Sequence, residues 1–580
     1  MSQFAAPISE QIWDMKYRHK SHDGTIYDQD VKDTWRRIAK ALASVEKYPE
    51  HWEPVFYDAL EDWKYLPAGR ITAGAGTGRN VTLFNCYVNG TIPDDMGGIF
   101  DALKDAALTM QAGGGIGYDF STLRPKGAHV KGVDADASGP LSFMDVWDAM
   151  CRTIMSAGSR RGAMMATMRC DHPDIEDFIT AKHDARRLRM FNVSVLVTDP
   201  FMDAVRNDLD WPLVFEGKVY RTVKARDLWD KIMRATYDYA EPGVIFIDRI
   251  NKRNPLNYCE TIAATNPCGE QALPPYGACL LGSINLVKFV HNGVFDMYAL
   301  KQTVKIAVRM MDNTIDASKY PLPQQEAEAH AKRRIGLGVT GLADALAMCG
   351  VVYGSDEAVQ ITERVMQLIA ETSYRASIDL AKEKGAFPLF DPEQYYADTV
   401  PELADKIKKH GIRNALLTSI APTGTISLYA GNVSSGIEPI FATAYNRKVL
   451  LPDGGHATEE VVDYAVAEYR KRSNSKKLPS WFVTAQDLPP SAHVKMQAAA
   501  QKYVDNAISK TVNCPADISF EEFKEVYMLA YEMGCKGCTT YRPNDVTGSV
   551  LTVSDDATGA DDAAQACIYD PETGERSCAA

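Results

Sequence analysis

The segment Asn266-Pro267-Cys268-Gly269-Glu270 places three reactive side chains close together in the chain. An amide, a thiol and a carboxylate occupy alternate positions, which project to the same side of an extended or looped backbone. Pro267 restricts that backbone, and Gly269 permits a tight tip. The three side chains can therefore converge on one small substrate. A second thiol, Cys279, follows soon afterwards, and this combination suits redox chemistry on a hydroxylated substrate better than hydrolysis.

Taken alone, such a pentapeptide is more often a turn that buries a thiol. Three other segments argue against that reading here. They are Leu83-Phe84-Asn85-Cys86-Tyr87-Val88, Arg333-Arg334-Ile335-Gly336-Leu337-Gly338-Val339-Thr340-Gly341-Leu342 and Ala421-Pro422-Thr423-Gly424-Thr425-Ile426-Ser427. In this order and spacing, the set closely resembles the catalytic subunit of ribonucleotide reductases, above all the adenosylcobalamin-dependent class, class II. The resemblance runs from about Pro67 to Val550.

The composition is that of a large cytoplasmic protein. With 580 residues, of which 46% are hydrophobic, the chain can bury one large core or two to three domains. Its net charge of −13 argues against nonspecific binding to nucleic acid or to membranes. No apolar run is long enough to span a bilayer, and residues 1–20 lack a signal-peptide core. Twelve cysteines without an export signal indicate thiols with chemistry rather than a disulfide framework.

The two ends of the chain differ from its centre. Residues 1–66 have helical periodicity, and we expect a small helical segment that is too short to hold the ATP-binding activity domain (ATP-cone) found in many ribonucleotide reductases. Residues 551–580 are small and acidic, which predicts a flexible, disordered tether.

Between them, residues 67–550 alternate short apolar runs with amphipathic helices, which predicts an α/β fold. The expected strands include 190–197 and 243–247, and the expected helices include 225–240 and 359–384. The resemblance implies a more specific architecture. It is a catalytic ten-stranded α/β barrel of two five-stranded half-barrels, with a finger loop through the centre.

The resemblance also assigns the catalytic residues of a thiyl-radical mechanism. Cys268 matches the radical cysteine at the tip of the finger loop. Glu270 matches the general base that removes the proton of the ribose 3′-hydroxyl group, and Asn266 matches the amide that holds the ribose hydroxyls. Cys86 and Cys279 match the reducing pair that becomes a disulfide in each turnover. Because these two are distant in sequence, only the fold can bring them within bonding distance.

A disulfide inside a barrel requires a carrier that can reach it. Cys567 and Cys578 fit a redox shuttle that exchanges thiols with the active site and then with an external dithiol such as thioredoxin or glutaredoxin. More residues separate these two cysteines than usually separate the cysteine pair in the C-terminal tail of the family. The alternative CxxC, Cys535 to Cys538, lies in a segment that resembles the family's core, which indicates a structural or cofactor-proximal role. No further ligands for a metal are evident near it.

The third matching segment is a candidate phosphate site. Hydroxyl groups and free backbone N–H groups at the start of a helix bind anions, although a plain helix cap is the commoner use of such residues. In the family this segment grips the diphosphate of the substrate. The substrate phosphate-binding residues are then Pro422, Thr423, Gly424, Thr425, Ile426 and Ser427. The segment 434–439 also matches the family, without an assigned role.

Other segments match the family's allosteric specificity site. The run Gly113-Gly114-Gly115-Ile116-Gly117 lacks the dinucleotide-binding spacing and resembles the segment that leads into this site. Effector binding, by a dNTP or ATP, is expected near loop 1 (residues 126–138) and loop 2 (residues 156–165), which transmit effector identity to base choice. The expected effector-binding residues are Asp94, Asp95, Arg124, Arg160 and Arg161.

The radical source follows from what the C-terminal region lacks. A class I catalytic large subunit receives its radical through adjacent tyrosines, but the matching region here, 538–542, has the single tyrosine Tyr541. The glycyl-radical motif of class III is also absent from the sequence. Adenosylcobalamin is therefore the expected cofactor. The alternatives are a class I large subunit or a non-catalytic nucleotide-binding relative, and the presence of both Cys268 and Glu270 disfavours the latter.

Substrate and assembly follow from the resemblance as well. It favours ribonucleoside diphosphates over triphosphates, and their reduction supplies DNA precursors. Monomeric members of the class carry a large insertion between the first reducing cysteine and the radical cysteine. Residues 87–267 leave no gap for such a module, so we expect a homodimer whose second subunit completes the effector site.

Overall fold

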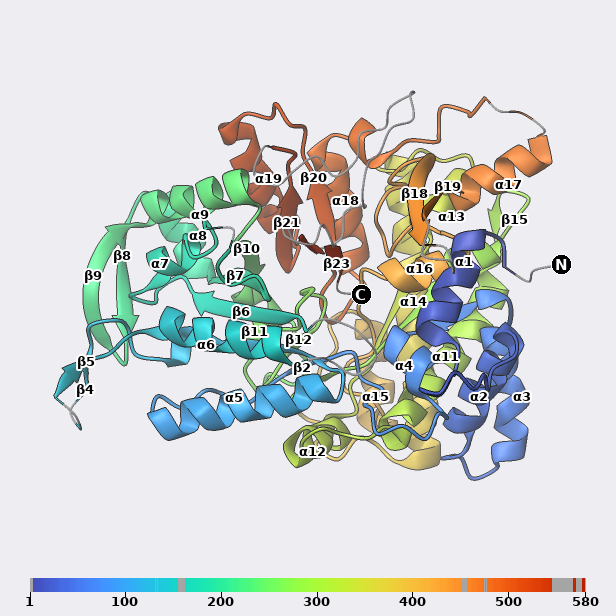
Figure 1. Ribbon diagram of the computed structural model, residues 1–580, viewed down its shortest axis with the longest axis horizontal. Coiled ribbons are helices and arrows are strands. Elements are labelled where there is room, and N and C mark those ends of the chain that lie inside the picture. Colours follow the sequence, from blue (N-terminus) through green and yellow to red (C-terminus); the bar gives the residue numbers. More distant parts are fainter. Residues whose placement is uncertain are drawn as a thin grey trace.

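The computed structural model describes residues 4–130, 132, 134–154, 162–184, 186–450, 456–473, 475 and 477–544. For residues 446–450 and 456–460, and for 567–569 and 576–578, it describes the backbone alone. Within this part of the chain, no helix has both the length and the apolar character needed to cross a membrane. Figure 1 shows two regions of mixed helix and sheet side by side, with the N-terminal helices on the outside of one of them.

The larger sheet has eight strands in the order β13-β2-β3-β6-β7-β10-β21-β20. Five neighbouring strands run parallel, namely β2 (Cys86–Val88), β3 (Gly115–Asp119), β6 (Met164–Arg169), β7 (Phe191–Val197) and β10 (Gly243–Phe246). At the edges, β13 (Ala278–Cys279) pairs antiparallel with β2, and β21 (Gly537–Tyr541) pairs antiparallel with β10 and parallel with β20 (Thr511–Asn513). Because both faces of parallel strands are covered, β7 and β10 contain no charged residue.

Helices cover the outer face of this sheet. They are α5 (Met96–Gln111), α6 (Pro140–Thr153), α8 (Asp199–Arg206), α9 (Ala225–Tyr239) and α19 (Phe520–Glu532). The apolar faces of these helices, with Trp147 of α6 as an example, and the outward residues of the strands, with Phe191 of β7 as an example, form one buried core. Polar caps fix where the helices begin. Asp95 accepts a bond from the N–H of Gly98 at the start of α5, and Ser519 with Glu522 forms a capping box on α19.

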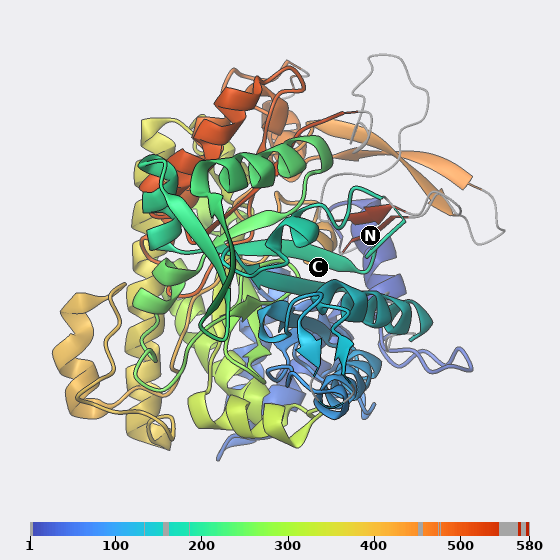
Figure 2. The same ribbon diagram turned by 90° about the vertical axis from the view of Figure 1, so that its left-hand side faces the viewer.

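The second region is built on a three-stranded sheet, β1 (Tyr65–Pro67), β14 (Leu281–Asn285) and β17 (Gly336–Thr340), in the order β1-β14-β17. Isolated parallel bridges join Leu337 to Thr418 and Ile420 to Ile508, which continues the pairing beyond β17. The long helices α11 (Met297–Ala317) and α14 (Asp356–Lys384) pack against each other over this sheet. Figure 2 shows α14 running along one side of the molecule, with the short helix α15 (Ala404–His410) outside it.

The N-terminal helices α2 (Val31–Ala43) and α3 (Pro49–Leu60) share the core of this second region. A buried ionic contact fixes the junction, because the Nε of Arg309 on α11 donates to the Oε1 of Glu46 at 2.6 Å. Burial opposes ionisation of Glu46, but its bonds to Arg309 and neighbouring polar groups lower its pKa to about 2. The predicted N-terminal helical segment is therefore bound tightly to the second region.

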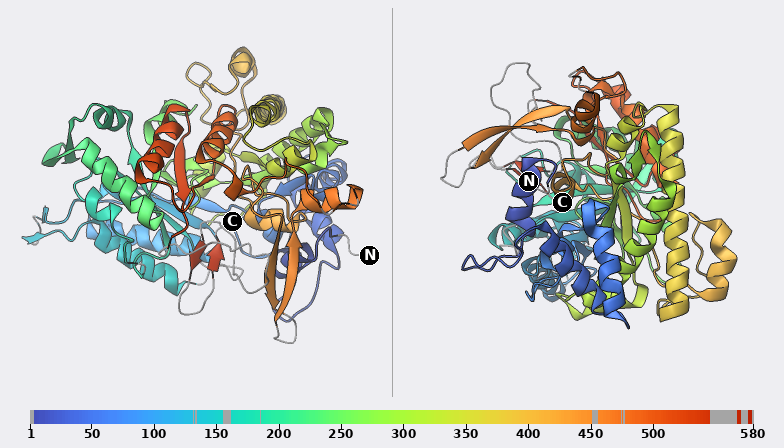
Figure 3. Two further views of the ribbon diagram at one scale, coloured as in Figure 1. Left: turned by 90° about the horizontal axis from the view of Figure 1, so that it is seen from above. Right: turned by 90° about the vertical axis from the view of Figure 1, so that its right-hand side faces the viewer.

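Hairpins extend from both regions. A short one, β4 (His129–Val130) with β5 (Ala135–Asp136), lies within the expected loop 1 and reaches away from the larger sheet (Figure 1). A longer one, β18 (Ala444–Leu450) with β19 (His456–Val462), projects from the second region, as Figure 3 shows.

The predicted α/β fold is confirmed. The expected strands 190–197 and 243–247 are β7 and β10, and the expected helices 225–240 and 359–384 are α9 and α14. Five parallel strands lie next to one another in the larger sheet of eight. The described strands form sheets of eight and three strands, two-stranded sheets and isolated bridges, so the two five-stranded half-barrels and their closure into a ring of ten strands stay a prediction.

Candidate functional site

The segment around Cys268 forms a hairpin between the two sheets. Strands β11 (Ala264–Thr265) and β12 (Ala272–Leu273) pair antiparallel and leave residues 266–271 as the tip. On one side, the hydroxyl of Thr167 on β6 donates to the carbonyl of Ala263 at 2.8 Å. On the other side, the N–H of Ala507 donates to the carbonyl of Glu270 at 3.1 Å. The hairpin, called the finger below, thus contacts both halves of the molecule.

Asn266 holds the tip in shape. Its N–H donates to the carbonyl of Gln271, and its Oδ1 accepts from the N–H of Gln271, both at 3.0 Å. The N–H of Gly269 donates to the carbonyl of Asn266 at 3.1 Å, which makes a tight turn with Gly269 at φ +80°. Asn266 is fully buried, and its Nδ2 lies 3.9 Å from the Sγ of Cys279. The amide therefore lies between the tip and the second thiol.

Cys268 and Glu270 differ in their exposure. Cys268 is half-buried, at the end of the tip that solutes can reach. The side chain of Glu270 is buried, and two bonds fix its main chain, because its carbonyl accepts from the Oγ of Ser419 at 2.8 Å as well as from Ala507. The tip therefore presents a half-buried thiol next to a buried carboxyl group whose main chain is held by two hydrogen bonds.

Cys86 and Cys279 are direct partners across the edge of the larger sheet. In the antiparallel pairing of β2 with β13, Cys279 stands opposite Cys86, and both are buried free cysteines. Directly opposed residues of an antiparallel pair have Cα atoms about 4.5 to 5.5 Å apart, within the range that a disulfide spans. The fold thus brings together two thiols that are far apart in sequence.

The electrostatics place four reactive groups in one site. Burial raises the pKa of the Cys279 thiol well above its usual value, and Cys86, Glu270 and Cys268 raise it further. These groups can affect Cys279 only if they lie close to it. A half-buried thiol that is converted to a thiyl radical, a buried carboxylate and two buried thiols have the chemistry to remove a hydrogen atom and a proton from one substrate and to supply two electrons.

Two glycines that the sequence analysis did not assign to this site make room for the finger. A Cβ atom at Gly115 would lie 3.1 Å from the Sγ of Cys86 and 3.3 Å from the Cγ of Pro267. A Cβ atom at Gly117 would lie 1.9 Å from the carbonyl oxygen of Thr265. Glycine on alternate residues of one predicted strand signals a close backbone approach on one face, and this signal was present in the sequence.

The candidate phosphate segment begins a short helix, α16 (Gly424–Tyr429). The hydroxyl of Thr423 lies 2.9 Å from that of Thr340 and accepts from the N–H of Gly436 at 2.7 Å. The hydroxyl of Ser427 contacts Ser435 at 3.1 Å. These two hydroxyls therefore hold the segment in shape. Ala421, just before it, belongs to the same small apolar cluster as Cys86 and Cys279.

Of this segment's other members, Pro422 and Thr425 are partly exposed, whereas Gly424 and Ile426 are buried. The neighbouring segment 434–439, for which the sequence suggested no role, has a structural one. Glu438 accepts from the fully buried Nζ of Lys510 at 2.5 Å and from the N–H of Thr511 at 2.7 Å. This contact ties the segment to strand β20.

Of the expected effector residues, Asp94, Asp95 and Arg124 lie within the described part of the chain. Arg124 binds Asp94 through its backbone N–H, its Nε and its Nη2, at 3.0, 2.8 and 2.9 Å. Asp95 caps helix α5. Arg160 and Arg161 lie outside the described residues, as does most of the expected loop 2.

The C-terminal cysteines are also opposed in register. The backbone of β22 (Cys567–Tyr569) pairs antiparallel with β23 (Arg576–Cys578), and Cys567 stands opposite Cys578. The rest of the expected tether, residues 551–566, 570–575 and 579–580, lies outside the described residues. In the competing CxxC, Cys535 and Cys538 are buried, and burial raises the pKa of both thiols. Buried neutral thiols are poor in exchange, which favours a structural role.

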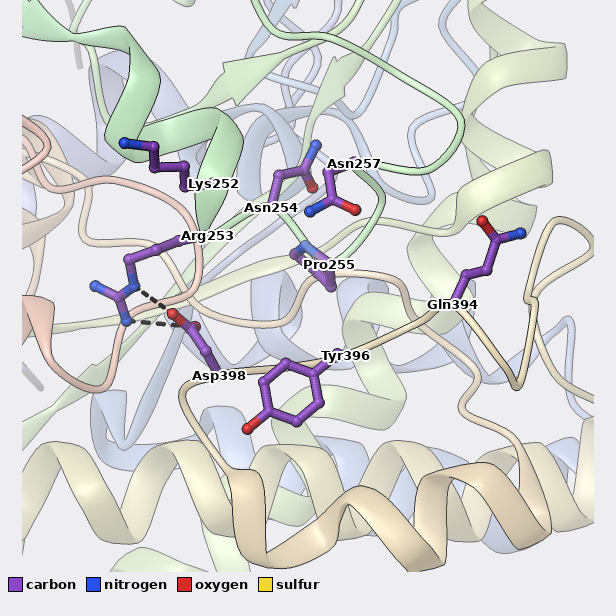
Figure 4. Close-up of a pocket in the computed structure, with 8 residues that line it drawn as sticks. All are labelled: Lys252, Arg253, Asn254, Pro255, Asn257, Gln394, Tyr396 and Asp398. Atoms are coloured by element: carbon purple, nitrogen blue, oxygen red, sulfur yellow. Dashed lines mark hydrogen bonds and ion pairs between the residues drawn. The ribbon is translucent and has the colours of Figure 1, made fainter. Parts of the chain in front are cut away.

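A small cavity lies apart from these groups, at the end of helix α10 (Ile247–Lys252), and measures about 70 Å³. Figure 4 shows Arg253 and Asp398 paired at its edge, with an Nε to Oδ2 distance of 2.7 Å. None of the predicted catalytic residues lines it. Among the described residues, no group of three or more His, Cys, Asp or Glu side chains could hold a metal ion.

Comparison with known proteins agrees with this geometry. Residues 84–541 match the profile of the ribonucleotide reductase barrel domain, and residues 3–80 match that of the ribonucleotide reductase all-alpha domain.

Curated proteins with similar sequences extend over most of the chain. A protein of Mycobacterium tuberculosis named vitamin B12-dependent ribonucleoside-diphosphate reductase is 39% identical over 545 residues, which cover 89% of this chain and 76% of that protein. A protein of the same name from Thermoplasma acidophilum is 38% identical over 94% of this chain and 72% of its own length. The ribonucleoside-diphosphate reductase subunit alpha of Chlamydia muridarum is 27% identical over 90% of this chain and 57% of its own length.

Proposed function

Because the chain belongs to the ribonucleotide reductase family, we propose that it reduces ribonucleoside diphosphates to 2′-deoxyribonucleotides with adenosylcobalamin as its radical source. The observation that carries this proposal is the meeting of Cys268 and Glu270 on the finger with the opposed thiols of Cys86 and Cys279. The relatives from Mycobacterium tuberculosis and Thermoplasma acidophilum are named vitamin B12-dependent ribonucleoside-diphosphate reductases.

The chain's own residues perform the reduction in a fixed order. As a thiyl radical, Cys268 removes the hydrogen atom from the ribose 3′-carbon, and the carboxylate of Glu270 takes the proton of the 3′-hydroxyl group. The 2′-hydroxyl group leaves as water with a proton from one thiol of the pair, the 2′-carbon receives the hydrogen of the other thiol, and Glu270 returns its proton to the 3′-oxygen. Cys86 and Cys279 supply two electrons and become a disulfide. Cys268 then returns a hydrogen atom to the 3′-carbon, so its thiyl radical is regenerated.

The exposure of the three thiols fits a cofactor that acts from outside the tip. Cys268 is half-buried, whereas Cys86 and Cys279 are 6% and 0% exposed. When bound, adenosylcobalamin supplies the radical that generates the thiyl group. The neutral, buried state of Cys279 protects the reducing pair from reaction with solutes while substrate is bound.

Substrate and reductant complete the cycle in this proposal. Pro422 to Ser427 bind the diphosphate next to the thiols, and thioredoxin or glutaredoxin reduces the Cys567–Cys578 pair, which passes its electrons to the buried pair. The two halves close as a ten-stranded barrel around the finger. Asp94 and Arg124 belong to a site for a dNTP or ATP effector that controls substrate specificity.

We also propose that the active assembly is a homodimer. Helix α5 exposes Met96 and Phe100, which are 63% and 50% accessible, and neighbouring α6 exposes Val146. A second copy would cover this apolar face by an isologous contact beside the effector site. Light scattering with dTTP is the measurement. Phe100→Asp should give a monomer. The control Tyr298→Asp, on the exposed start of α11, should leave the dimer intact. A wild-type monomer that still shows effector-dependent specificity would contradict the dimer.

The test of the main proposal is reconstitution. Purified protein with CDP, adenosylcobalamin, dATP and dithiothreitol should form dCDP, and Cys268→Ser should form none because an O–H bond is too strong for the radical to open. Omission of adenosylcobalamin should stop the reaction. Turnover without cobalamin but with a metal-loaded second subunit would identify a class I enzyme instead, and preference for CTP would overturn the diphosphate assignment.

A further inference from the structure

The carbonyl group of Pro267 has an anchor outside the finger. Asn192 on β7 donates from its Nδ2 to the oxygen of Pro267 at 2.8 Å. Its neighbours Phe191 and Val193 are buried in the helix-covered core, whereas Asn192 is partly exposed on the opposite face. The side chain therefore lies on the face of the sheet that meets the finger.

This hydrogen bond bears directly on the position of Cys268. The oxygen of Pro267 and the nitrogen of Cys268 belong to one planar peptide group. Fixing the direction of that oxygen therefore fixes the plane of the peptide group. The Cα atom of Cys268 lies in this plane, so its position relative to the tip is fixed as well. Pro267 has no N–H group, so its carbonyl group supplies the polar contact of this residue's backbone.

A second strand restrains the same residue from another direction. The Cγ of Pro267 lies 3.3 Å from the place of a Cβ atom at Gly115 on β3. β3 and β7 both flank β6 in the sheet. Pro267 thus approaches the backbone of β3 closely and accepts a hydrogen bond from β7, and both neighbours belong to the parallel sheet rather than to the finger.

We propose that Asn192 is a positioning residue that sets the direction of the Cys268 thiol, an inference that rests on the proposed role of Cys268. Hydrogen abstraction depends steeply on the distance and alignment of the reacting atoms. Asn192 acts through the peptide group and does not touch substrate.

The test compares Asn192→Ala and Asn192→Asp with the wild type. Alanine removes the donor. Aspartate keeps the size of the side chain but, when ionised, offers only acceptors to a carbonyl oxygen. We expect kcat to fall about tenfold in the alanine variant and further in the aspartate variant, because one hydrogen bond is lost or reversed. KM for CDP should stay within about twofold, since the phosphate segment is untouched.

Hydrogen–deuterium exchange gives a readout that needs no cofactor. The peptide that covers residues 264–273 should exchange faster in both variants, while peptides of β3 and β10 should not change. Asn207→Asp is the matched control, because Asn207 is an exposed asparagine on the far end of α8 whose amide bonds only locally to the carbonyl of Asp203. It should match the wild type in kcat and exchange.

The outcomes separate this inference from the proposed function. An unchanged kcat in Asn192→Ala and Asn192→Asp overturns the positioning role, whatever the exchange rates are. A fall of kcat with a matching rise of KM also overturns it, because that pattern indicates a role in binding. If the wild type itself forms no dCDP, the proposed function fails, while faster exchange at 264–273 would still show that Asn192 anchors the tip.

Discussion

Two cysteine pairs in this chain are directly opposed across antiparallel strands, but the two pairs lie in sheets of very different size. Cys86 and Cys279 face each other at the edge of an eight-stranded sheet, whereas Cys567 and Cys578 face each other in a two-stranded hairpin. The pairing of Cys86 with Cys279 is part of the eight-stranded sheet, whereas the pairing of Cys567 with Cys578 is part of a two-stranded sheet. A small two-stranded hairpin is marginally stable by itself in water. Under the proposed roles, the chain would keep the first pair fixed for chemistry and leave the second to exchange thiols.

The largest effect should follow removal of the buried pair. Cys279→Ser and Cys86→Ser should each reduce multiple turnover about 10³-fold with either thioredoxin or dithiothreitol, because one remaining thiol cannot supply two electrons. Formation of dCDP over many cycles is the measurement. Turnover above about a tenth of the wild-type rate in either variant would show that the buried pair is not the reductant.

Removal of the C-terminal pair should matter only for protein reductants. A tethered dithiol acts at an effective concentration in the millimolar range, so Cys567→Ser or Cys578→Ser should slow thioredoxin-driven turnover about tenfold or more. Turnover with excess dithiothreitol should remain near that of the wild type, since a small dithiol reaches the buried pair by itself. Equal losses with both reductants would contradict the shuttle.

The importance of the hairpin register can be tested separately. In the double variant Ser577→Cys with Cys578→Ser, the thiol moves to the position opposite Ile568, and its side chain projects to the other face of the hairpin. Thioredoxin-driven turnover should fall about fivefold, a smaller loss than with one cysteine missing, because both thiols remain on the tail. If this variant works as well as the wild type, proximity rather than register brings the pair together.

The smallest effect concerns pH. Burial raises the pKa of Cys279 above its ordinary value of about 9, so the folded thiol stays protonated where an unfolded one ionises. Its contribution to stability is full below about pH 9 and is lost as the pH rises further. Iodoacetamide at pH 8.5 should therefore label Cys279 in urea but not in the native protein, by mass spectrometry of the labelled peptides. Rapid native labelling of Cys279 would exclude the buried, neutral thiol.

The sequence indicated which residues of the site come together, but not which residues support them. The motifs predicted that Cys268, Glu270, Cys86 and Cys279 act together, and the fold brings them close. Asn192 was not predicted, since its contact with Pro267 depends on the depth to which the finger enters the sheet. That depth is a long-range property with no local pattern.

The glycines at 115 and 117 and the aspartate at 95 were also local signals in the sequence, and they were interpreted as parts of the effector site or of the segment that leads into it. Alternate glycines at 115 and 117 indicated a close approach on one face of a strand, although the resemblance drew attention to the effector site. Asp95 stands three residues before Gly98 at the start of α5, a pattern typical of a helix cap. The end of α14 at Lys384 followed from periodicity, because local spacing decides it, whereas the helix begins at Asp356 and not at the expected residue 359. The register of Cys86 opposite Cys279 did not follow from local spacing, because residues distant in sequence determine it.

The position of the finger between the two halves has a consequence for how the chain folds. In the folded chain the finger is bonded to Thr167 of β6 on one side and to Ser419 and Ala507 on the other. Contacts between residues so distant in sequence require large loops to close early, which slows folding. During synthesis on the ribosome, the larger sheet also waits for β13 and β21 to complete its edges. Until then the thiols of Cys86 and Cys279 are unprotected, so we expect the chain to fold successfully only under reducing conditions.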